Sequence, residues 1–213
     1  MHKLYSFFRS SAAFRVRIAL NLKGLDYETI PVHLLKGEQR EAGFLALNPA
    51  GLVPVLIENG SLLTQSLAII EYLDETRPAP ALLPGSALDR ARIRALALAI
   101  ACEIHPLNNT RVLKYLVRTL GVDEAAKNAW YRHWVEQGLA SVERQLDHPS
   151  TGRFCHGDTP TLADCCLVPQ IFNARRFDCS LDHVPTVMRV FEHCMALDAF
   201  QRAAPAAQPD AEQ

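Results

Sequence analysis

A change of sequence pattern near the proline-rich stretch PAPALLPG, residues 78–85, limits the folds open to this chain. Before this stretch, short β-type runs alternate with segments of helical periodicity. After it, nearly every segment repeats apolar residues at helical spacing. We therefore predict two domains, an α/β domain over residues 1–80 and an all-helical domain over residues 86–213.

The first domain is expected to have the element order β-α-β-α-β-β-α. Asn59-Gly60 lies between two apolar runs and is the strongest hairpin signal in the chain. Pro31 indicates that the second strand lies at an edge or breaks there. The expected elements are strands at 3–6 and 27–34, a hairpin at 53–64, helices at 11–23 and 65–78, and a short helix within 36–49. An α/β domain that ends in an antiparallel hairpin and is followed by helices is typical of a thioredoxin-like module joined to a helical domain.

The second domain is expected to contain three long helical segments. They are predicted at about 87–119, with an interruption at Pro106, at about 123–147, and after Pro160. The tail AAPAAQPDAEQ, residues 203–213, is rich in alanine and proline and is expected to be loosely ordered.

Charge and composition exclude several classes of partner. The net charge is −1, which gives no electrostatic basis for binding nucleic acid or an anionic membrane. No apolar run approaches the roughly 20 residues of a membrane span, and the N-terminus MHKLYSFF lacks the apolar core of a signal peptide. The six cysteines show no CxxC pair and no metal-ligand spacing, so we expect reduced core residues and no metal site. These features predict a cytoplasmic protein with a small-molecule or protein partner.

Four ordered motifs together resemble the zeta class of glutathione transferases. They are RSSAAFRVRIALNLKG at 9–24, NPAGLVPVL at 48–56, TQSLAIIEYL at 64–73 and GDTPTLADCCLVPQ at 157–170. The resemblance covers essentially the whole chain. It implies the glutathione transferase fold, a homodimer, and glutathione as cofactor. It also implies cis–trans isomerisation of maleylacetoacetate in tyrosine and phenylalanine catabolism, with maleylpyruvate isomerisation or a broader transferase activity as alternatives.

The serine pair that opens the first motif suggests how a thiol would be activated. A helix N-terminus offers unpaired N–H groups and a partial positive charge, which favour an anion. The resemblance implies that Ser10 stabilises the thiolate of bound glutathione, with Ser11 close by and the small Ala12 and Ala13 leaving room for sulfur. A plain N-cap is the alternative for these serines. Ala12 departs from the cysteine that many zeta-class members carry at this position.

The resemblance also implies further contacts with glutathione. Val53-Pro54 matches a cis-proline turn whose valine backbone pairs with the cysteinyl part of the cofactor, whereas an ordinary trans proline is the common alternative. Gln65 and Ser66 match a site for the γ-glutamyl carboxylate at a helix start, where a simple cap needs no ligand. Gln39 matches a contact with the glycine carboxylate, although polar loop residues are usually solvated.

The helical domain supplies the remaining candidate site residues. His105 and Asn109 match family positions near glutathione and the electrophile, and a packed core histidine is the alternative for His105. Arg9, Arg111 and Arg176 are candidates for binding the substrate, because a planar guanidinium binds carboxylates through two hydrogen bonds. Each arginine is otherwise expected to be a solvated surface charge.

Other features favour structural or alternative readings. Thr161 and Asp164 have capping-box spacing and are predicted to start a helix rather than to act in catalysis. Arg15 and Arg17 are expected to serve packing or ion pairs. A thiol–disulfide oxidoreductase would need a CxxC that SSAA lacks. A broad conjugating enzyme would need an open apolar site, and a non-catalytic binding protein would tolerate the loss of Ser10.

Overall fold

The computed structural model describes residues 2–211 and divides the chain into two compact units. One unit contains the chain up to Leu83 together with the segment from Met195 onward, and the other is Pro84–Cys194. The sequence predicts that residues 86–213 form one helical domain, whereas the segment after Cys194 groups with the α/β unit.

The α/β unit is built on a four-stranded sheet of order β2-β1-β3-β4. Strand β1 (His2–Ser6) runs parallel to β2 (Tyr27–Pro31) and antiparallel to β3 (Val55–Glu58). Strand β4 (Ser61–Thr64) completes the predicted hairpin with β3. Its turn residues Asn59 and Gly60 have φ of 50° and 84°, as a two-residue hairpin turn requires. β2 ends at Pro31 on the edge of the sheet, which confirms the prediction made from that proline.

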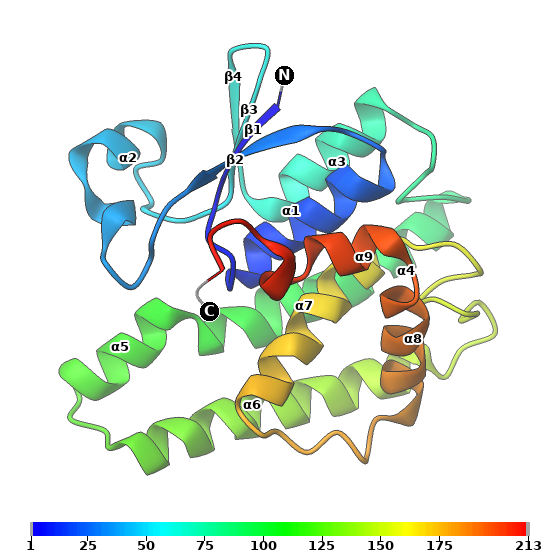
Figure 1. Ribbon diagram of the computed structural model, residues 1–213. Helices are drawn as coiled ribbons and strands as arrows, with labels where there is room; N and C mark the ends of the chain where they lie inside the picture. Colours follow the sequence, from blue (N-terminus) through cyan, green and yellow to red (C-terminus); the bar gives the residue numbers. More distant parts are fainter. Residues whose placement is uncertain (1, 212–213) are drawn as a thin grey trace. The chain divides into compact units, whose positions relative to one another are not determined.

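Helices connect and cover these strands. α1 (Ser11–Leu22) and α3 (Ser66–Thr76) pack against each other, and α2 (Ala42–Leu47) stands apart from them in Figure 1. A short 3₁₀ turn, η1 (Glu38–Arg40), precedes α2. The βαβ and ββα order is the one expected of a thioredoxin-like module.

The C-terminal segment is ordered by long-range contacts with this unit. α9 (Asp198–Ala203) packs on α1, where Asn21 Nδ2 donates to Ala199 O at 2.9 Å. A 3₁₀ turn, η4 (Pro205–Ala207), follows, and the Phe8 N–H donates to Asp210 Oδ2 at 2.9 Å. The expectation of a loosely ordered tail is therefore wrong for the residues up to 211, because the main chain of the α/β unit fixes them.

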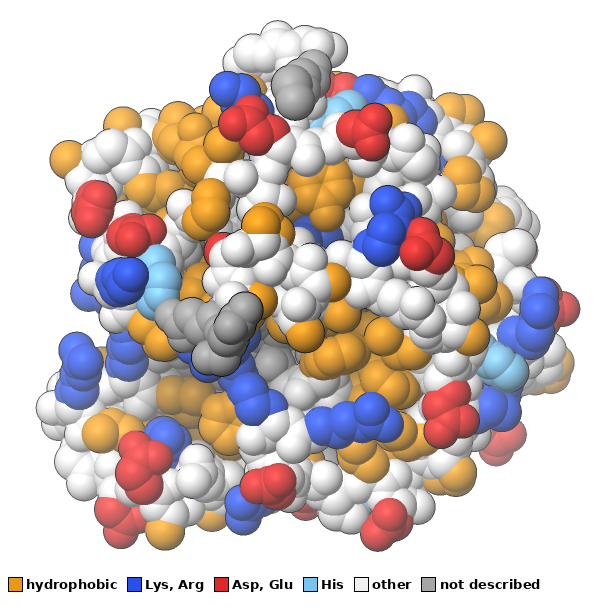
Figure 2. All heavy atoms as spheres, in the orientation of Figure 1, with side chains coloured by type: hydrophobic (Ala, Val, Ile, Leu, Met, Phe, Trp, Pro, Cys, Tyr) orange, Lys and Arg blue, Asp and Glu red, His pale blue; other side chains and the backbone are white. Residues whose placement is uncertain are grey.

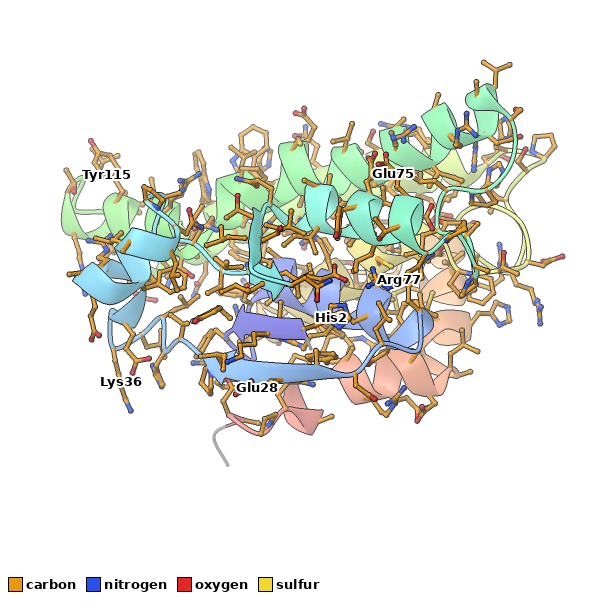
Figure 3. The ribbon with its side chains drawn as sticks, turned by 90° about the horizontal axis from the view of Figure 1, so that it is seen from above. His2, Glu28, Lys36, Glu75, Arg77 and Tyr115 are labelled. Atoms are coloured by element: carbon orange, nitrogen blue, oxygen red, sulfur yellow. The ribbon has the colours of Figure 1, made fainter. Side chains whose placement is uncertain are left out.

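A polar cluster lies at the end of the sheet beside the hairpin turn, where β3 ends at Glu58. His2 Nε2 lies 3.1 Å from Glu58 Oε1, and Figure 3 shows His2 beside Arg77. Arg77 also pairs with Glu58, whose side chain is only 5% exposed. Despite the burial of Glu58, the hydrogen bond and charge of Arg77 lower the pKa of its carboxyl.

The helical unit begins with α4 (Ala87–Leu98), which continues into a π-helical turn, η2 (Ala99–Ile104), and a 3₁₀ turn, η3 (His105–Asn108). The predicted interruption at Pro106 is confirmed, since α5 (Thr110–Arg118) starts only after this turn. The remaining helices are α6 (Glu124–Leu146), α7 (Leu162–Arg176) and α8 (Pro185–Met195).

α6 packs closely against η2 because it carries a glycine at the contact. A Cβ built at Gly138 would lie 2.4 Å from Cγ1 of Ile104, so a side chain there would push the two elements apart. The core of the unit is apolar and includes Ile93, Val135 and Ile171.

The cysteines follow the prediction of reduced core residues with one exception. All six cysteines are free, and five are buried, but Cys102 is exposed and is not a core residue. Figure 2 shows acidic and basic side chains interspersed on the visible face. Within residues 2–211, no helix is long and apolar enough to cross a membrane, and no cluster of potential metal ligands occurs.

Candidate functional site

The Ser10 hydroxyl lies at the N-terminus of α1. Its Oγ accepts a hydrogen bond from the Ala13 N–H at 3.3 Å, so the N-cap role is realised. This bond uses the oxygen as an acceptor and leaves the hydroxyl proton available to an anion. The first turn of α1 contains no acidic residue. The helix start is therefore a site that can stabilise negative charge.

Ser11 and Ala13 form the adjoining buried part of this helix start, and Ala12 is half-buried. Ser11 is 6% exposed and Ala13 is fully buried, whereas Ser10 is only half-buried. Of the two hydroxyls, that of Ser10 is therefore the more accessible to a ligand.

The loop before β3 places a main-chain edge beside the segment that carries Ser10. Val53-Pro54 is a cis peptide, as predicted. The buried Val53 side chain packs in one cluster with Phe7 and Phe8. Within the described chain, the Val53 N–H and C=O take part in no backbone hydrogen bond. These two groups are free to pair with an extended ligand main chain in the manner of a β-strand.

Asn48 holds this loop in place and was not singled out in the sequence. Its Nδ2 donates to Leu52 O at 2.7 Å, and its Oδ1 accepts from the Ala50 N–H at 3.1 Å. The sequence signal was available, because an asparagine before proline and glycine commonly bonds its own turn.

A second helix start in the same unit has the features of an anion site. Gln65 precedes α3 with φ of 68° and ψ of 114°, a conformation that costs a non-glycine residue on the order of 1–3 kcal/mol. Ser66 is 6% exposed, and its Oγ accepts a hydrogen bond from Arg15 Nη1 at 3.3 Å. The first turn of α3 contains no acidic residue. The helix dipole and the buried Arg15 cation both favour a carboxylate at this position.

Sequence reasoning assigned Arg15 to packing or ion pairs and missed its contact with Ser66. The side chain is 3% exposed within a helix whose other members are mostly apolar. A buried arginine requires polar partners, so its place in an apolar run was a usable signal.

Gln39 lies on η1 with its amide only partly satisfied. Nε2 donates to Leu34 O at a long 3.4 Å, and the buried Oε1 has no partner among residues 2–211. An orphaned acceptor does not bind a carboxylate, but a half-turn of the amide about its terminal torsion exchanges donor and acceptor. The residue can therefore offer either group to a ligand.

In the helical unit, the predicted site residues lie near the helix interruption at Pro106, and their main visible role is to shape the helix ends. Asn109 caps α5, because its Oδ1 accepts from the Arg111 N–H at 3.0 Å. His105 is half-buried at the start of η3, and Arg111 is exposed. Trp130 Nε1 donates to Leu107 O at 2.9 Å, which fastens this turn to α6.

Arg176 lies at the C-terminal end of α7, next to two aromatic residues. Its guanidinium stands over the Phe177 ring, 5.0 Å from the centroid, and hydrogen-bonds the Tyr131 side chain. Tyr131 is buried and stacks on Phe177 with 3.7 Å between ring centroids. Burial raises the pKa of Tyr131, so its hydroxyl stays neutral. Arg176 is exposed at the end of α7, and its guanidinium is a group of the kind that binds carboxylates.

The site residues predicted from the sequence are distributed over both units. Arg9 stands over the rings of Phe7 and Phe8, at 5.6 and 5.0 Å from their centroids. No ion pair of Arg9 or Arg111 occurs within the described part of the chain. The α/β unit contains Arg9, Ser10, Ser11, Gln39, Val53, Pro54, Gln65 and Ser66, and the helical unit contains His105, Asn109, Arg111 and Arg176.

Comparisons with known proteins identify the family of this chain. Residues 2–75 match the family described as glutathione S-transferase, N-terminal domain. A probable maleylacetoacetate isomerase of Vibrio cholerae serotype O1 is 52% identical over 210 residues, which cover 98% of this chain and 97% of the relative.

Solved structures match over the full length. The structure described as holo maleyl pyruvate isomerase, a bacterial glutathione S-transferase in the zeta class, is 54% identical with a TM-score of 0.97 and covers 99% of this chain and 100% of that one. A maleylacetoacetate isomerase from Methylobacterium extorquens AM1 with bound malonate and GSH is 44% identical with a TM-score of 0.96, covering 99% of this chain and 100% of that one. Because the likeness extends over both units at this level of identity, the chain belongs to the zeta class of glutathione transferases.

Proposed function

We propose that this protein is a glutathione-dependent cis–trans isomerase that converts maleylacetoacetate to fumarylacetoacetate in tyrosine and phenylalanine catabolism. The observation that carries the proposal is the Ser10 hydroxyl at the start of α1, with a free proton and no acidic neighbour in the first turn. It is supported by relatives over the full length that are named maleylacetoacetate and maleylpyruvate isomerases.

The α/β unit fits glutathione by the chemistry of its free polar groups. Val53 offers an unpaired main chain to the cysteinyl part, Gln65 and Ser66 receive the γ-glutamyl carboxylate, and Gln39 binds the glycine end. The unpaired Val53 main chain and the acid-free start of α3 are the observations that favour this fit. His105 and Asn109 of the helical unit are proposed to lie near the bound cofactor and substrate.

Ser10 is proposed to lower the pKa of the cofactor thiol, with Ser11 in support. A free thiol has a pKa of about 8.5 and is only a few per cent ionised at neutral pH. Lowering the pKa by two units requires about 2.7 kcal/mol of differential stabilisation. One hydroxyl bond to a charged acceptor, together with the helix-end N–H groups, supplies an energy of this size.

Bound glutathione supplies a thiol nucleophile whose reversible addition allows rotation about the former cis double bond. Arg9, Arg111 and Arg176 are proposed to bind the substrate carboxylates and to stabilise the negative charge that develops on the substrate oxygen. Such electrostatic stabilisation is usually the largest contribution a protein makes. The malonate in the Methylobacterium extorquens structure is a small dicarboxylate of the same chemical kind.

Maleylpyruvate is the second candidate substrate, because the solved structure with 54% identity is a maleyl pyruvate isomerase. A broader conjugating activity is less favoured, since three candidate arginines suit a small acidic electrophile better than an aryl halide. We also propose that the protein acts as a homodimer in the cytoplasm, with no nucleic acid, membrane or metal partner.

The test is an assay of both maleyl acids with and without glutathione, in which formation of the fumaryl product is followed by ultraviolet absorbance. We expect isomerisation that depends on glutathione but does not consume it, with higher kcat/KM for maleylacetoacetate. Conjugation of an aryl halide serves as the comparison reaction. Efficient conjugation without isomerisation of either acid would contradict the proposal.

A further inference from the structure

The loop that leads to Ser10 is held at Phe8, whose backbone N–H and C=O both make hydrogen bonds to side chains. The Phe8 N–H donates to Asp210 Oδ2 at 2.9 Å, and Phe8 O accepts from Arg17 Nη2 at 2.9 Å. Asp210 lies 202 residues away in the sequence. Two residues after Phe8, Ser10 bonds back to this loop through its N–H, which donates to Phe7 O at 2.8 Å. The position of the Ser10 backbone therefore depends on how Phe8 is held.

Arg17 is the buried centre of this arrangement. Its side chain is fully buried, and its Nε donates to Ala203 O at 2.9 Å while Nη1 donates to Ser6 Oγ at 2.9 Å. One guanidinium thus joins the end of β1, the loop and the end of α9. A buried cation is costly unless its charge is balanced. Burial lowers the pKa of the Arg17 guanidinium to about 10, and the charges of Tyr27 and Asp210 oppose this shift.

The C-terminal tail is built to present Asp210 to the loop. Gln208, only 8% exposed, donates through Nε2 to Arg202 O at 2.8 Å and to Ala204 O at 3.0 Å. Ala211 packs against the apolar cluster that contains Phe7 and Phe8. The contacts of Gln208 and Ala211 therefore hold the chain on either side of Asp210. The Asp210 carboxylate contacts the loop through a charge-assisted hydrogen bond from the Phe8 N–H.

We propose that Asp210 is a positioning residue, which acts from the C-terminal tail through Phe8 to hold the Ser10 hydroxyl where it meets the cofactor thiol. This inference rests on the proposed function, because it assigns a purpose to the loop only if Ser10 acts on a thiol. A carboxylate that served only to hold the tail in place would affect stability and leave the chemistry at Ser10 unchanged.

The test uses Asp210→Ala and Asp210→Asn in the full-length protein, with Asp198→Ala as matched control. Asp198 is an exposed carboxylate of the same segment that pairs with Arg202 at 2.7 Å. The main readout is a titration of bound glutathione, in which thiolate absorbance is followed against pH. The pH profile of kcat/KM and the glutathione Kd are measured beside it, and a thermal melt identifies variants that are folded.

We expect Asp210→Ala to reduce the thiolate fraction of bound glutathione near neutral pH by about threefold. The same change should lower kcat/KM by about threefold to tenfold, since small displacements at a reacting group are costly. Asp210→Asn keeps an acceptor for the Phe8 N–H but loses the charge, so its values should lie between those of wild type and Asp210→Ala. The glutathione Kd should change little, and Asp198→Ala should match wild type.

A folded Asp210→Ala variant whose thiol titrates as in wild type would overturn the inference. If that variant does not fold, a wild-type titration curve in Asp210→Asn would overturn it instead. Failure of the proposed function is a different result, because wild-type protein itself would then leave the thiol of added glutathione at its solution pKa.

Discussion

Asp164 accepts two hydrogen bonds from Thr161, one from the hydroxyl at 2.7 Å and one from the backbone N–H at 2.8 Å. The carboxylate is fully buried, and its second oxygen accepts from the Cys155 N–H at 2.8 Å. The pair forms the predicted capping box at the start of α7. One side chain therefore joins the start of this helix to the loop that precedes it.

Loss of this carboxylate should destabilise the fold strongly. Asp164→Ala leaves three buried donors without an acceptor, so we expect the free energy of unfolding to fall by about 3 kcal/mol. Urea denaturation followed by circular dichroism measures the change. Asp182→Ala is the control, because Asp182 is exposed and should alter stability by less than about 0.5 kcal/mol. Equal stability of the two variants would contradict this account of α7.

The same residue predicts a pH dependence. Burial raises the pKa of Asp164 above its usual 3.8, so the folded state retains this proton to a higher pH than the unfolded state does. Folding then binds a proton in this interval, and stability falls as pH rises from about 3.8 to the raised pKa. Asp164→Asn has the same shape and does not titrate. The stability of wild type relative to Asp164→Asn should therefore fall with rising pH in urea titrations, and a rise would contradict the raised pKa.

Arg176 should matter for substrate more than for cofactor. A charge-assisted hydrogen bond contributes roughly 1.5–3 kcal/mol, so Arg176→Ala should lower kcat/KM about tenfold to a hundredfold. Its glutathione Kd should stay near that of wild type. Steady-state kinetics with both maleyl acids provides the measurement, and Arg175→Ala, at the exposed neighbouring position, is the control. An unchanged kcat/KM for both acids would exclude Arg176 from substrate binding.

The sequence predicted those parts of the fold that short-range chemistry determines. Asn59-Gly60 fixes a hairpin through its own backbone preferences, and Pro106 ends a helix because it lacks an N–H. The order of the C-terminal tail was not predicted, because it depends on bonds such as the one from Phe8 to Asp210 across 202 residues. Composition alone makes that tail look mobile.

The candidate site also contains features that sequence motifs predict and contacts that they do not. The N-cap role of Ser10 follows from local capping chemistry, whereas the cis Val53-Pro54 peptide is expected only from the family resemblance, and the structure confirms both. The partners of Arg15 and Arg17 lie on other elements, Ser66 on α3 and Ala203 on α9. Periodicity shows that such residues face the core but not what they meet there.

In the proposed mechanism, the Ser10 hydroxyl activates the thiol of bound glutathione. Its removal should affect the charged sulfur far more than the binding of the rest of the cofactor, because the hydroxyl acts chiefly on the thiolate. Ser11→Ala is the matched control, since this neighbouring hydroxyl is buried at the same helix start.

The most direct measurement compares the isomerisation kcat/KM of wild type, Ser10→Ala and Ser11→Ala, together with the glutathione Kd of each. We predict that Ser10→Ala loses about a hundredfold in kcat/KM while its Kd changes by less than about threefold, and that Ser11→Ala loses much less. Wild-type turnover in Ser10→Ala would contradict the account and assign thiol activation to Ser11 or to the N–H groups of α1.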